Sequence, residues 1–118
     1  MPRRDWRLRV ADMLDAAQTA MGLAVGLDKA DFLADRVLVD AAIKNISVLG
    51  EAAMHVPDEV ARLWPEIPWR KMRDMRNVIV HEYFGVNPDI LWGTVRDDLP
   101  SLVPTLSRML EADSPNAR

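Results

Sequence analysis

The sequence predicts an all-α protein with one domain over residues 1–111, built from about four to five helices. Apolar residues recur at spacings of three and four residues, and no stretch alternates apolar and polar residues for long enough to indicate a strand. Prolines and glycines divide the periodic stretches into segments of helical length. With 118 residues, of which 49% are hydrophobic and 28% charged, the chain has the size and composition of a single globular domain.

The first helix is predicted to follow Asp5, whose side chain can accept hydrogen bonds from the free N–H groups of the first turn. It ends near residue 22, because Gly22 and Gly26 allow the left-handed backbone that often terminates a helix. Its apolar stripe consists of Leu8, Met13, Leu14, Ala17 and Met21.

A longer helical stretch is predicted from about Asp28 to His55, and it can be broken near Ala34 or Asp35 before Pro57 ends it. For His55, at the end of this stretch, a capping or dipole interaction fits better than catalysis, and its role stays unassigned. The apolar spacing comes from Val37, Ala41, Ile43, Ile46, Val48 and Leu49.

The segment that follows Pro57 also contains Pro65 and Pro68, so it has room only for a short helix, Asp58–Leu63, before a turn. We expect apolar side chains to hold this turn against the core. These are Trp64, Ile67 and Trp69.

Two proline signals open the remaining helices. Pro68 suits a first helical position, where its missing N–H costs nothing, and Gly85 offers a left-handed stop, which predicts one helix over Trp69–Phe84. Asn87 followed by Pro88 repeats this start signal and opens the last helix.

The last helix is the most apolar, but two prolines interrupt its pattern. Pro100 and Pro104 each remove a backbone donor and clash with the preceding turn, so we expect a kink or a break there. Residues 112–118 are predicted to be a frayed tail. The apolar positions of the helix are Leu91, Trp92, Val95, Leu99, Leu102, Leu106 and Leu110.

Composition excludes several classes of function. The absence of cysteine excludes a disulfide scaffold, a thiolate metal site and a cysteine nucleophile, and it fits a reducing compartment. No apolar run approaches the roughly 18 residues of a membrane span, and the N-terminus lacks the apolar core of a secretion signal. The sequence therefore predicts a cytoplasmic protein without a membrane partner.

A formal net charge of -3 argues against a protein that coats nucleic acid non-specifically, but the basic residues are clustered. Such clusters are most often solvated helix faces. The second cluster precedes a histidine on the same predicted helix, where positive charge would favour the approach of an RNA backbone. The first cluster is Arg3, Arg4, Arg7 and Arg9, and the second is Arg70, Lys71, Arg73 and Arg76.

Polar groups with catalytic potential gather around His81, whereas the other histidine, His55, stands alone. At about 100° per helical residue, Tyr83 lies about 20° from Arg76, Asn77 about 100° and His81 about 140°. The four groups therefore occupy a little under half of the helix circumference. Apolar side chains adjoin this arc, namely Met72, Met75 and Ile79.

These residue types suit cleavage of an RNA phosphodiester bond. A neutral imidazole such as that of His81 can remove the 2′-hydroxyl proton, and a guanidinium such as that of Arg76 can stabilise the charge that develops on phosphate oxygens. Asn77, one turn before His81, can fix the orientation and tautomer of the imidazole. Neither step needs a metal ion, and His81 has only Glu82 as a neighbouring carboxylate, so no metal and no cofactor is expected.

Two of these residues could instead have a structural role. Arg76 lies at the edge of the apolar face, where an arginine either extends from the core to water or presents its fork at an interface. Tyr83 could contact a phosphate or stack on a base, but an aromatic side chain at an apolar boundary more often belongs to the core.

The string Arg-Asn-Val-Ile-Val-His-Glu-Tyr at residues 76–83 matches the Arg-x-x-x-x-His-x-Tyr signature of the HepT toxins, a branch of the HEPN ribonuclease superfamily. A bare Arg and His pair would be a weak signal, but the flanking segments also resemble the family. The resemblance covers nearly the whole chain. The flanking segments are Asp12–Asp15, Asn45–Ala53, Pro65–Trp69, Phe84–Val86 and Asp97–Pro100.

This resemblance implies an up-and-down HEPN bundle that forms a homodimer, with Arg76 and His81 of both subunits facing a cleft at the interface. It implies a metal-independent endoribonuclease toxin in which Arg76 and His81 are catalytic and Asn77 and Tyr83 support them. The implied partner is an MNT-type nucleotidyltransferase antitoxin, which transfers AMP from ATP to Tyr83 and so blocks the RNA site.

Two other readings use the same residues differently. A HEPN domain can be a non-catalytic helical partner that binds substrate or nucleotide for an MNT-type nucleotidyltransferase. It can also be a purely structural helical dimer. Loss of RNA cleavage in folded Arg76→Ala and His81→Ala variants would distinguish the ribonuclease from both.

Overall fold

The computed structural model describes the backbone of residues 4–81 and 87–112 and the side chains of residues 6–76 and 87–112. Over these residues the chain forms four long helical stretches and two short helices, with no strand, which confirms the all-α prediction. The long stretches are α1 (Arg4–Leu23), α3 (Arg36–Met54), α5 (Trp69–His81) and the run formed by α6 (Pro88–Gly93), the π-helical η2 (Thr94–Asp98) and α7 (Leu99–Ala112). The short helices are α2 (Lys29–Ala34) and α4 (Asp58–Ala61).

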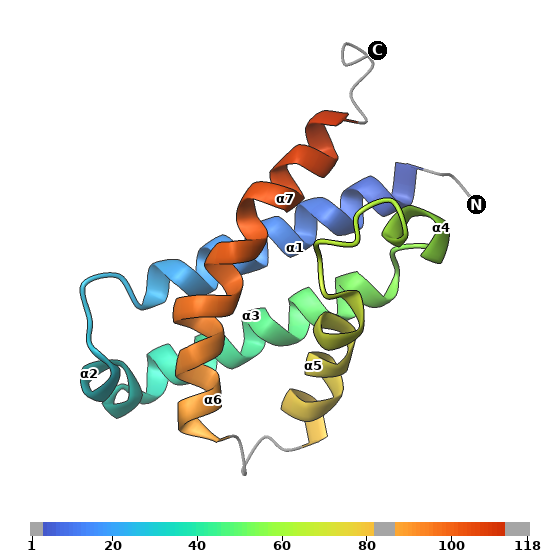
Figure 1. The fold of residues 1–118 in the computed structure, drawn as a ribbon. Coiled ribbons are helices and arrows are strands. Elements are labelled where there is room, and N and C mark those ends of the chain that lie inside the picture. The colour runs from blue at the N-terminus through green and yellow to red at the C-terminus, as the bar shows by residue number, and fades with distance from the viewer. Residues whose placement is uncertain (1–3, 82–86, 113–118) are drawn as a thin grey trace.

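The bundle is centred on α1 and α3, which pack against each other and run in opposite directions (Figure 1). α7 packs on α1, and α5 packs on α3. α5 therefore lies at the edge of the bundle, with one face against α3. This arrangement leaves part of α5, the helix that carries the predicted catalytic residues, available at the surface.

The first helix differs from the prediction at its start and agrees at its end. α1 begins at Arg4, so Asp5 lies inside its first turn and does not precede the helix as a cap. An acidic residue is also favoured in a first turn, because the helix dipole is positive there. α1 ends at Leu23, and Gly26 adopts a φ of 77° in the turn that follows.

The predicted break near residue 35 is present, and Asp35 causes it. The Asp35 side chain accepts hydrogen bonds from the N–H groups of Val37 (3.0 Å) and Leu38 (3.2 Å), while its backbone is extended. Asp28 caps α2 in the same way, by accepting from Asp31 N–H at 2.8 Å. A side-chain cap at Asp35 makes a new helix start more favourable than continuation of the old one.

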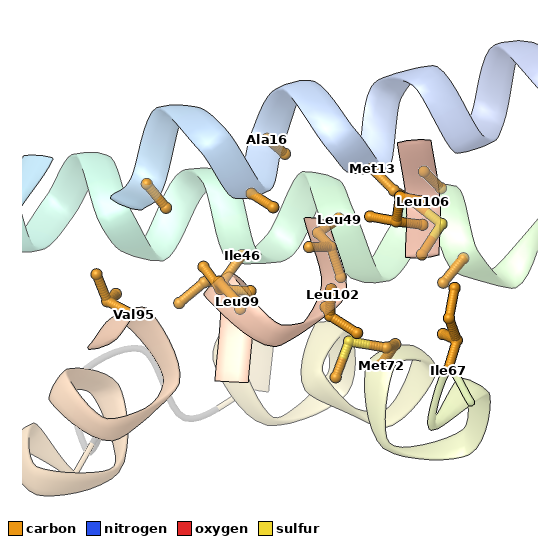
Figure 2. Close-up of a cluster of buried hydrophobic side chains, with 14 of the residues drawn as sticks. Met13, Ala16, Ile46, Leu49, Ile67, Met72, Val95, Leu99, Leu102 and Leu106 are labelled. Carbon is orange, nitrogen blue, oxygen red and sulfur yellow. The ribbon is translucent and has the colours of Figure 1, made fainter. Parts of the chain in front are cut away.

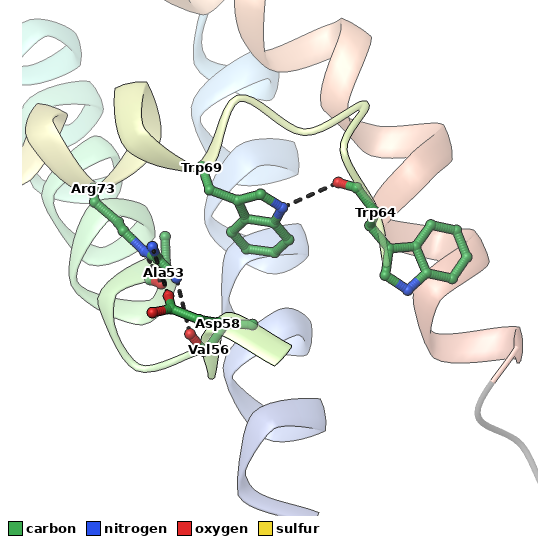
Figure 3. Close-up of polar contacts among 6 residues, drawn as sticks. All are labelled: Ala53, Val56, Asp58, Trp64, Trp69 and Arg73. Atoms are coloured by element: carbon green, nitrogen blue, oxygen red, sulfur yellow. Dashed lines mark hydrogen bonds and ion pairs between the residues drawn. The ribbon is translucent and has the colours of Figure 1, made fainter. Parts of the chain in front are cut away.

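The turn after α3 is held by tryptophan, as predicted. α4 ends at Ala61, two residues earlier than the expected Leu63. The Trp69 indole Nε1–H donates to the backbone oxygen of Trp64 at 3.0 Å (Figure 3), and Ile67 and Trp69 are buried. This closed turn sets the point at which α5 starts.

α5 begins at Trp69, directly after Pro68, as predicted. The expected end of this helix at Phe84 and its stop at Gly85 lie outside the described residues. α6 also begins as predicted, because the Asn87 side chain accepts from the N–H groups of Asp89 (2.8 Å) and Ile90 (3.2 Å), with Pro88 in the first turn.

The prolines of the last helix act differently from each other. The backbone widens before Pro100, where Leu99 N–H donates to Thr94 O in the π-helical segment, and α6 and α7 meet at an angle (Figure 1). At Pro104 the expected break is absent, because α7 continues through it to Ala112. Packing holds this helix together, since Leu102, Leu106 and other side chains of α7 are buried.

One apolar core joins all the long helices (Figure 2). The largest fully buried side chains come from α1, α2, α3, α5, η2, α7 and the turn before α5, which fits a bundle with no separate second core over the described residues. They are Met13, Val10, Phe32, Ile46, Leu49, Ile67, Met72, Val95, Leu99, Leu106 and Met109. The helix of interest, α5, is anchored in this core by Met72.

Candidate functional site

α3 and α5 approach each other most closely at Gly50. A Cβ atom added to Gly50 would lie 2.8 Å from both the Cβ and the backbone N of Arg76, and 3.0 Å from the backbone oxygen of Met72. Any larger residue would push the two helices apart, because contacts this short to backbone atoms are not tolerated. The contact fixes the backbone of Arg76 against α3.

The side chain of Arg76 leaves this contact and reaches the neighbouring residue of α3. Its Nε forms an ion pair with Oε1 of Glu51. The Arg76 side chain is 37% exposed and that of Glu51 46% exposed, so the pair lies at the surface. Arg76 therefore has a fixed backbone and a partly exposed side chain, which suits a group that meets a ligand.

Glu51 also has a partner at the end of its own helix. His55, the C-cap residue of α3, has its Nδ1 3.7 Å from Oε2 of Glu51 and 2.9 Å from the backbone oxygen of Glu51. Both neighbours of Nδ1 are hydrogen-bond acceptors, so Nδ1 carries the proton and donates. Glu51 thus stands between the guanidinium of Arg76 and the imidazole of His55.

An open groove of about 370 Å³ lies where α1, α3 and α5 meet, and Arg76 and Glu51 line it. Arg9 and Asp12 contribute a second cation and a second carboxylate from α1. The groove is thus polar and mixed in charge. The remaining lining residues are Ser47, Val48 and Ala52.

Arg73, which the sequence assigned to RNA binding together with Arg70 and Lys71, is held in a corner of the fold (Figure 3). Its guanidinium donates to Ala53 O at 3.0 Å and to Val56 O at 2.9 Å, and it lies 5.8 Å from the centre of the Trp69 ring. These bonds satisfy carbonyls at the end of α3 and join α5 to the turn that follows.

The other two members of this cluster differ from Arg73 in being exposed. Arg70 is exposed, and the exposed Lys71 forms an ion pair with Asp98 of η2 at 3.2 Å. Lys71 and Arg73 therefore contact different parts of the fold. A role of any of them in RNA binding stays a prediction.

The described residues cover the predicted site only in part. α5 carries Arg76, Asn77 and His81 on one continuous helix, but the side chains of Asn77 and His81 lie outside what the structure describes, and so does the whole of Tyr83. The arrangement of these groups around Arg76 therefore stays a prediction from helix geometry.

Sequence reasoning did not identify Gly50 and Glu51 as contacts of Arg76, and it left His55 without a role. Gly50 and Glu51 of α3 contact Arg76 only through the packing of α3 on α5, and His55, the C-cap residue of α3, contacts Glu51. The i,i+4 spacing of Glu51 and His55 was the only local signal. Over the described residues, no group of three or more His, Asp and Glu side chains could hold a metal ion.

The described helices include none with the length and apolar character that crossing a membrane requires.

Comparison with known proteins identifies a family that this chain matches. Residues 13–109 match the family described as ribonuclease HepT-like. A "Probable ribonuclease HepT" from Thermococcus cleftensis is 47% identical over 72 residues, which are 61% of this chain and 66% of that protein. A protein from Methanocaldococcus jannaschii, named as a candidate RNase, is 28% identical over 102 residues, or 86% of this chain and 94% of its own. A third protein, from Caldanaerobacter subterraneus and also named as a candidate RNase, is 33% identical over 88 residues. These are 75% of this chain and 79% of that protein.

No solved structure is significantly similar to this chain. The family match spans most of the sequence and includes α5 with Arg76 and His81, as well as the α3 segment that contacts Arg76. The resemblance seen in the signature at residues 76–83 is therefore confirmed by a match over residues 13–109. The chain belongs to the HepT-like ribonuclease family.

Proposed function

We propose that this chain is an endoribonuclease that cleaves RNA without a metal ion, with Arg76 and His81 as its catalytic residues. The observation that carries the proposal is the position of Arg76, whose backbone is fixed against α3 while its side chain lines an open groove. A guanidinium that starts from a fixed backbone loses less conformational freedom when it meets a phosphate. Helix geometry puts His81 about 7.5 Å further along α5.

The reaction follows from these two groups. The imidazole of His81 accepts the proton of a ribose 2′-hydroxyl, and the 2′-oxygen attacks the adjacent phosphorus. The bond from phosphorus to the 5′-oxygen breaks and the leaving oxygen takes a proton from water, which yields a 2′,3′-cyclic phosphate and a 5′-hydroxyl end. Arg76 stabilises the negative charge that builds up on the non-bridging oxygens during this step. Asn77 would orient the imidazole of His81.

A second copy of the chain would complete the site. The groove beside Arg76 is open to solvent, and a domain of this length encloses little space by itself. Resemblance to HEPN proteins supports a homodimer in which Arg76 and His81 of both subunits line one cleft at the interface. RNA would then bind between two copies of α5.

We further propose that the chain is the toxin of a toxin–antitoxin pair, controlled by an MNT-type nucleotidyltransferase. The phenolic oxygen of Tyr83 would attack the α-phosphorus of ATP, so that AMP is attached and pyrophosphate leaves. On a helix that extended to residue 83, Tyr83 would fall about 20° from Arg76. The added phosphate would compete with RNA for the Arg76 guanidinium.

The proposal is tested by incubating the purified chain with total RNA in excess EDTA. Wild type is compared with Arg76→Ala and His81→Ala at matched purity and matched thermal stability. Arg108→Ala is the matched control, because Arg108 is an exposed arginine of α7 that also pairs with a glutamate, Glu66, at 3.1 Å.

Cleavage by wild type and Arg108→Ala, lost in both site variants, is the expected result. An inactive wild-type protein, or cleavage that persists in His81→Ala, would overturn the assignment. In the inactive case, a nucleotidyltransferase whose activity rises when this chain is added would favour the non-catalytic binding partner instead.

A further inference from the structure

We propose that Glu51 is the positioning residue for Arg76, and that His55 in turn holds Glu51 in place. The proposal rests on the proposed function, because it assigns a role in the same site. It gives a purpose to the histidine that the sequence left unassigned. It concerns the geometry of Arg76 and not the chemistry of His81.

Arg76 needs a positioning residue because its backbone contact fixes only the start of the side chain. The close approach at Gly50 holds the Cβ and N of Arg76, but the long flexible stem of an arginine follows Cβ. With 37% of its side chain exposed, packing alone does not hold the guanidinium. The ion pair from Nε to Glu51 supplies a second fixed point, at the charged end.

Glu51 is placed well for this task. It is the residue after Gly50, so the contact that fixes the Arg76 backbone also fixes the Glu51 backbone relative to it. Its carboxylate contacts Arg76 through Nε, close to the guanidinium carbon. The pair can therefore orient the guanidinium plane relative to α3.

His55 supports Glu51 from the other side. Nδ1–H of His55 donates to the backbone oxygen of Glu51 at 2.9 Å and lies 3.7 Å from the second carboxylate oxygen. The first contact fixes the ring beside Glu51, and the second lets it attract the carboxylate. The backbone of His55 is fixed as well, because His55 is the C-cap residue of α3 and its N–H donates to the carbonyls of Ala52 and Ala53.

The carboxylate has a predictable effect on each kinetic constant. Glu51 carries a negative charge and so does not attract RNA; its benefit lies in keeping Arg76 ordered when charge develops on the phosphate. Removal should therefore lower kcat without raising KM. A merely structural ion pair at the surface would change neither constant, because exposed pairs contribute little to stability.

The experiment compares kcat and KM for a short RNA in EDTA among wild type, Glu51→Ala, Glu51→Gln and His55→Ala. Glu66→Gln is the matched control, since Glu66 is 50% exposed and pairs with Arg108 at 3.1 Å, away from the groove. We expect kcat to fall about threefold to tenfold in Glu51→Ala, which is the scale of ordering one flexible side chain. Glu51→Gln and His55→Ala should show smaller falls, and Glu66→Gln none.

A double-mutant cycle makes the test specific. In an Arg76→Lys background, which keeps the charge but lacks the fork, Glu51→Ala should cause no further loss of kcat. The same loss in both backgrounds, or unchanged kcat in Glu51→Ala, would overturn the positioning role. A rise in kcat/KM in Glu51→Ala would also overturn it, because Glu51 would then hinder Arg76. If the wild-type chain does not cleave RNA, the proposed function itself fails. Thermal midpoints of unfolding identify any variant that does not fold.

Discussion

Gly50 and Arg76 meet at a contact that leaves no room for a side chain on α3, since a Cβ at Gly50 would lie 2.8 Å from Arg76 Cβ and 2.8 Å from Arg76 N. Substitution Gly50→Ala should therefore push α5 away from α3 and displace Arg76. We expect the free energy of unfolding to fall by about 1–3 kcal/mol, because overpacking outweighs the higher helix propensity of alanine. RNA cleavage should fall further than the unfolded fraction explains.

Gly93→Ala is the control for this substitution. Gly93 ends α6, and an added Cβ has nothing within 4 Å, so the variant should be neutral or slightly more stable. Thermal unfolding and RNA cleavage are measured for both variants. Equal stability and equal activity of Gly50→Ala and wild type would show that the close contact does not set the position of Arg76.

Arg73 and Arg70 should respond differently to substitution, although the sequence placed them in one cluster. Arg73→Ala removes the donors to Ala53 O and Val56 O and should lower the free energy of unfolding by about 1–3 kcal/mol. Arg70 is exposed, so Arg70→Ala should change the free energy of unfolding by less than about 0.5 kcal/mol. Urea unfolding, monitored by circular dichroism, measures the free energy of unfolding of both variants.

RNA binding provides the second readout for the same pair. If Arg70 contacts phosphate, the slope of log affinity against log salt should fall by about one in Arg70→Ala. The measurement uses the inactive His81→Ala background, so that RNA is bound without being cut. An unchanged slope would remove Arg70 from the predicted RNA-binding residues.

The start of α3 depends on Asp35. Asp35→Ala removes the acceptor for the N–H groups of Val37 and Leu38 and should cost about 1 kcal/mol of stability. Asp35→Asn keeps an acceptor oxygen and should retain most of that stability. Chemical denaturation of the two variants tests this, and equal losses would mean that the hydrogen bonds to Asp35 do not stabilise the helix start.

The sequence predicted those parts of the fold that local signals determine. The break near Asp35, the Asn87 cap, the turn at Gly26 and the start of α5 after Pro68 were predicted, because each depends on residues a few positions away. That Asp35 caps α3 was found only in the structure. The prediction with Asp5 as cap starts the first helix about two residues later than Arg4, which is the usual uncertainty of a helix boundary.

Contacts between helices were beyond the same reasoning. The ion pair of Glu51 with Arg76 depends on how α3 and α5 cross, and hydrophobic periodicity shows which face of a helix is buried but not which residue it meets. The π-helical turn before Pro100 and the intact helix at Pro104 likewise depend on packing. The site was thus predicted as a set of residues on α5, without its supports on α3.

Control by AMP transfer is predicted to depend on Tyr83 alone. Tyr83→Phe keeps the aromatic ring and removes the acceptor oxygen, so the variant should fold and should not gain an adenylyl group from ATP and an MNT-type nucleotidyltransferase. Intact mass spectrometry measures the modification. An adenylyl group that still appears on Tyr83→Phe would place the acceptor elsewhere in the chain.

The ends of the cleaved RNA test the central claim most directly. In excess EDTA, attack by a 2′-oxygen with His81 as base predicts products with 2′,3′-cyclic phosphate and 5′-hydroxyl ends, absent when His81→Ala is used. Products with 3′-hydroxyl and 5′-phosphate ends, formed only when a divalent metal ion is supplied, would contradict the account.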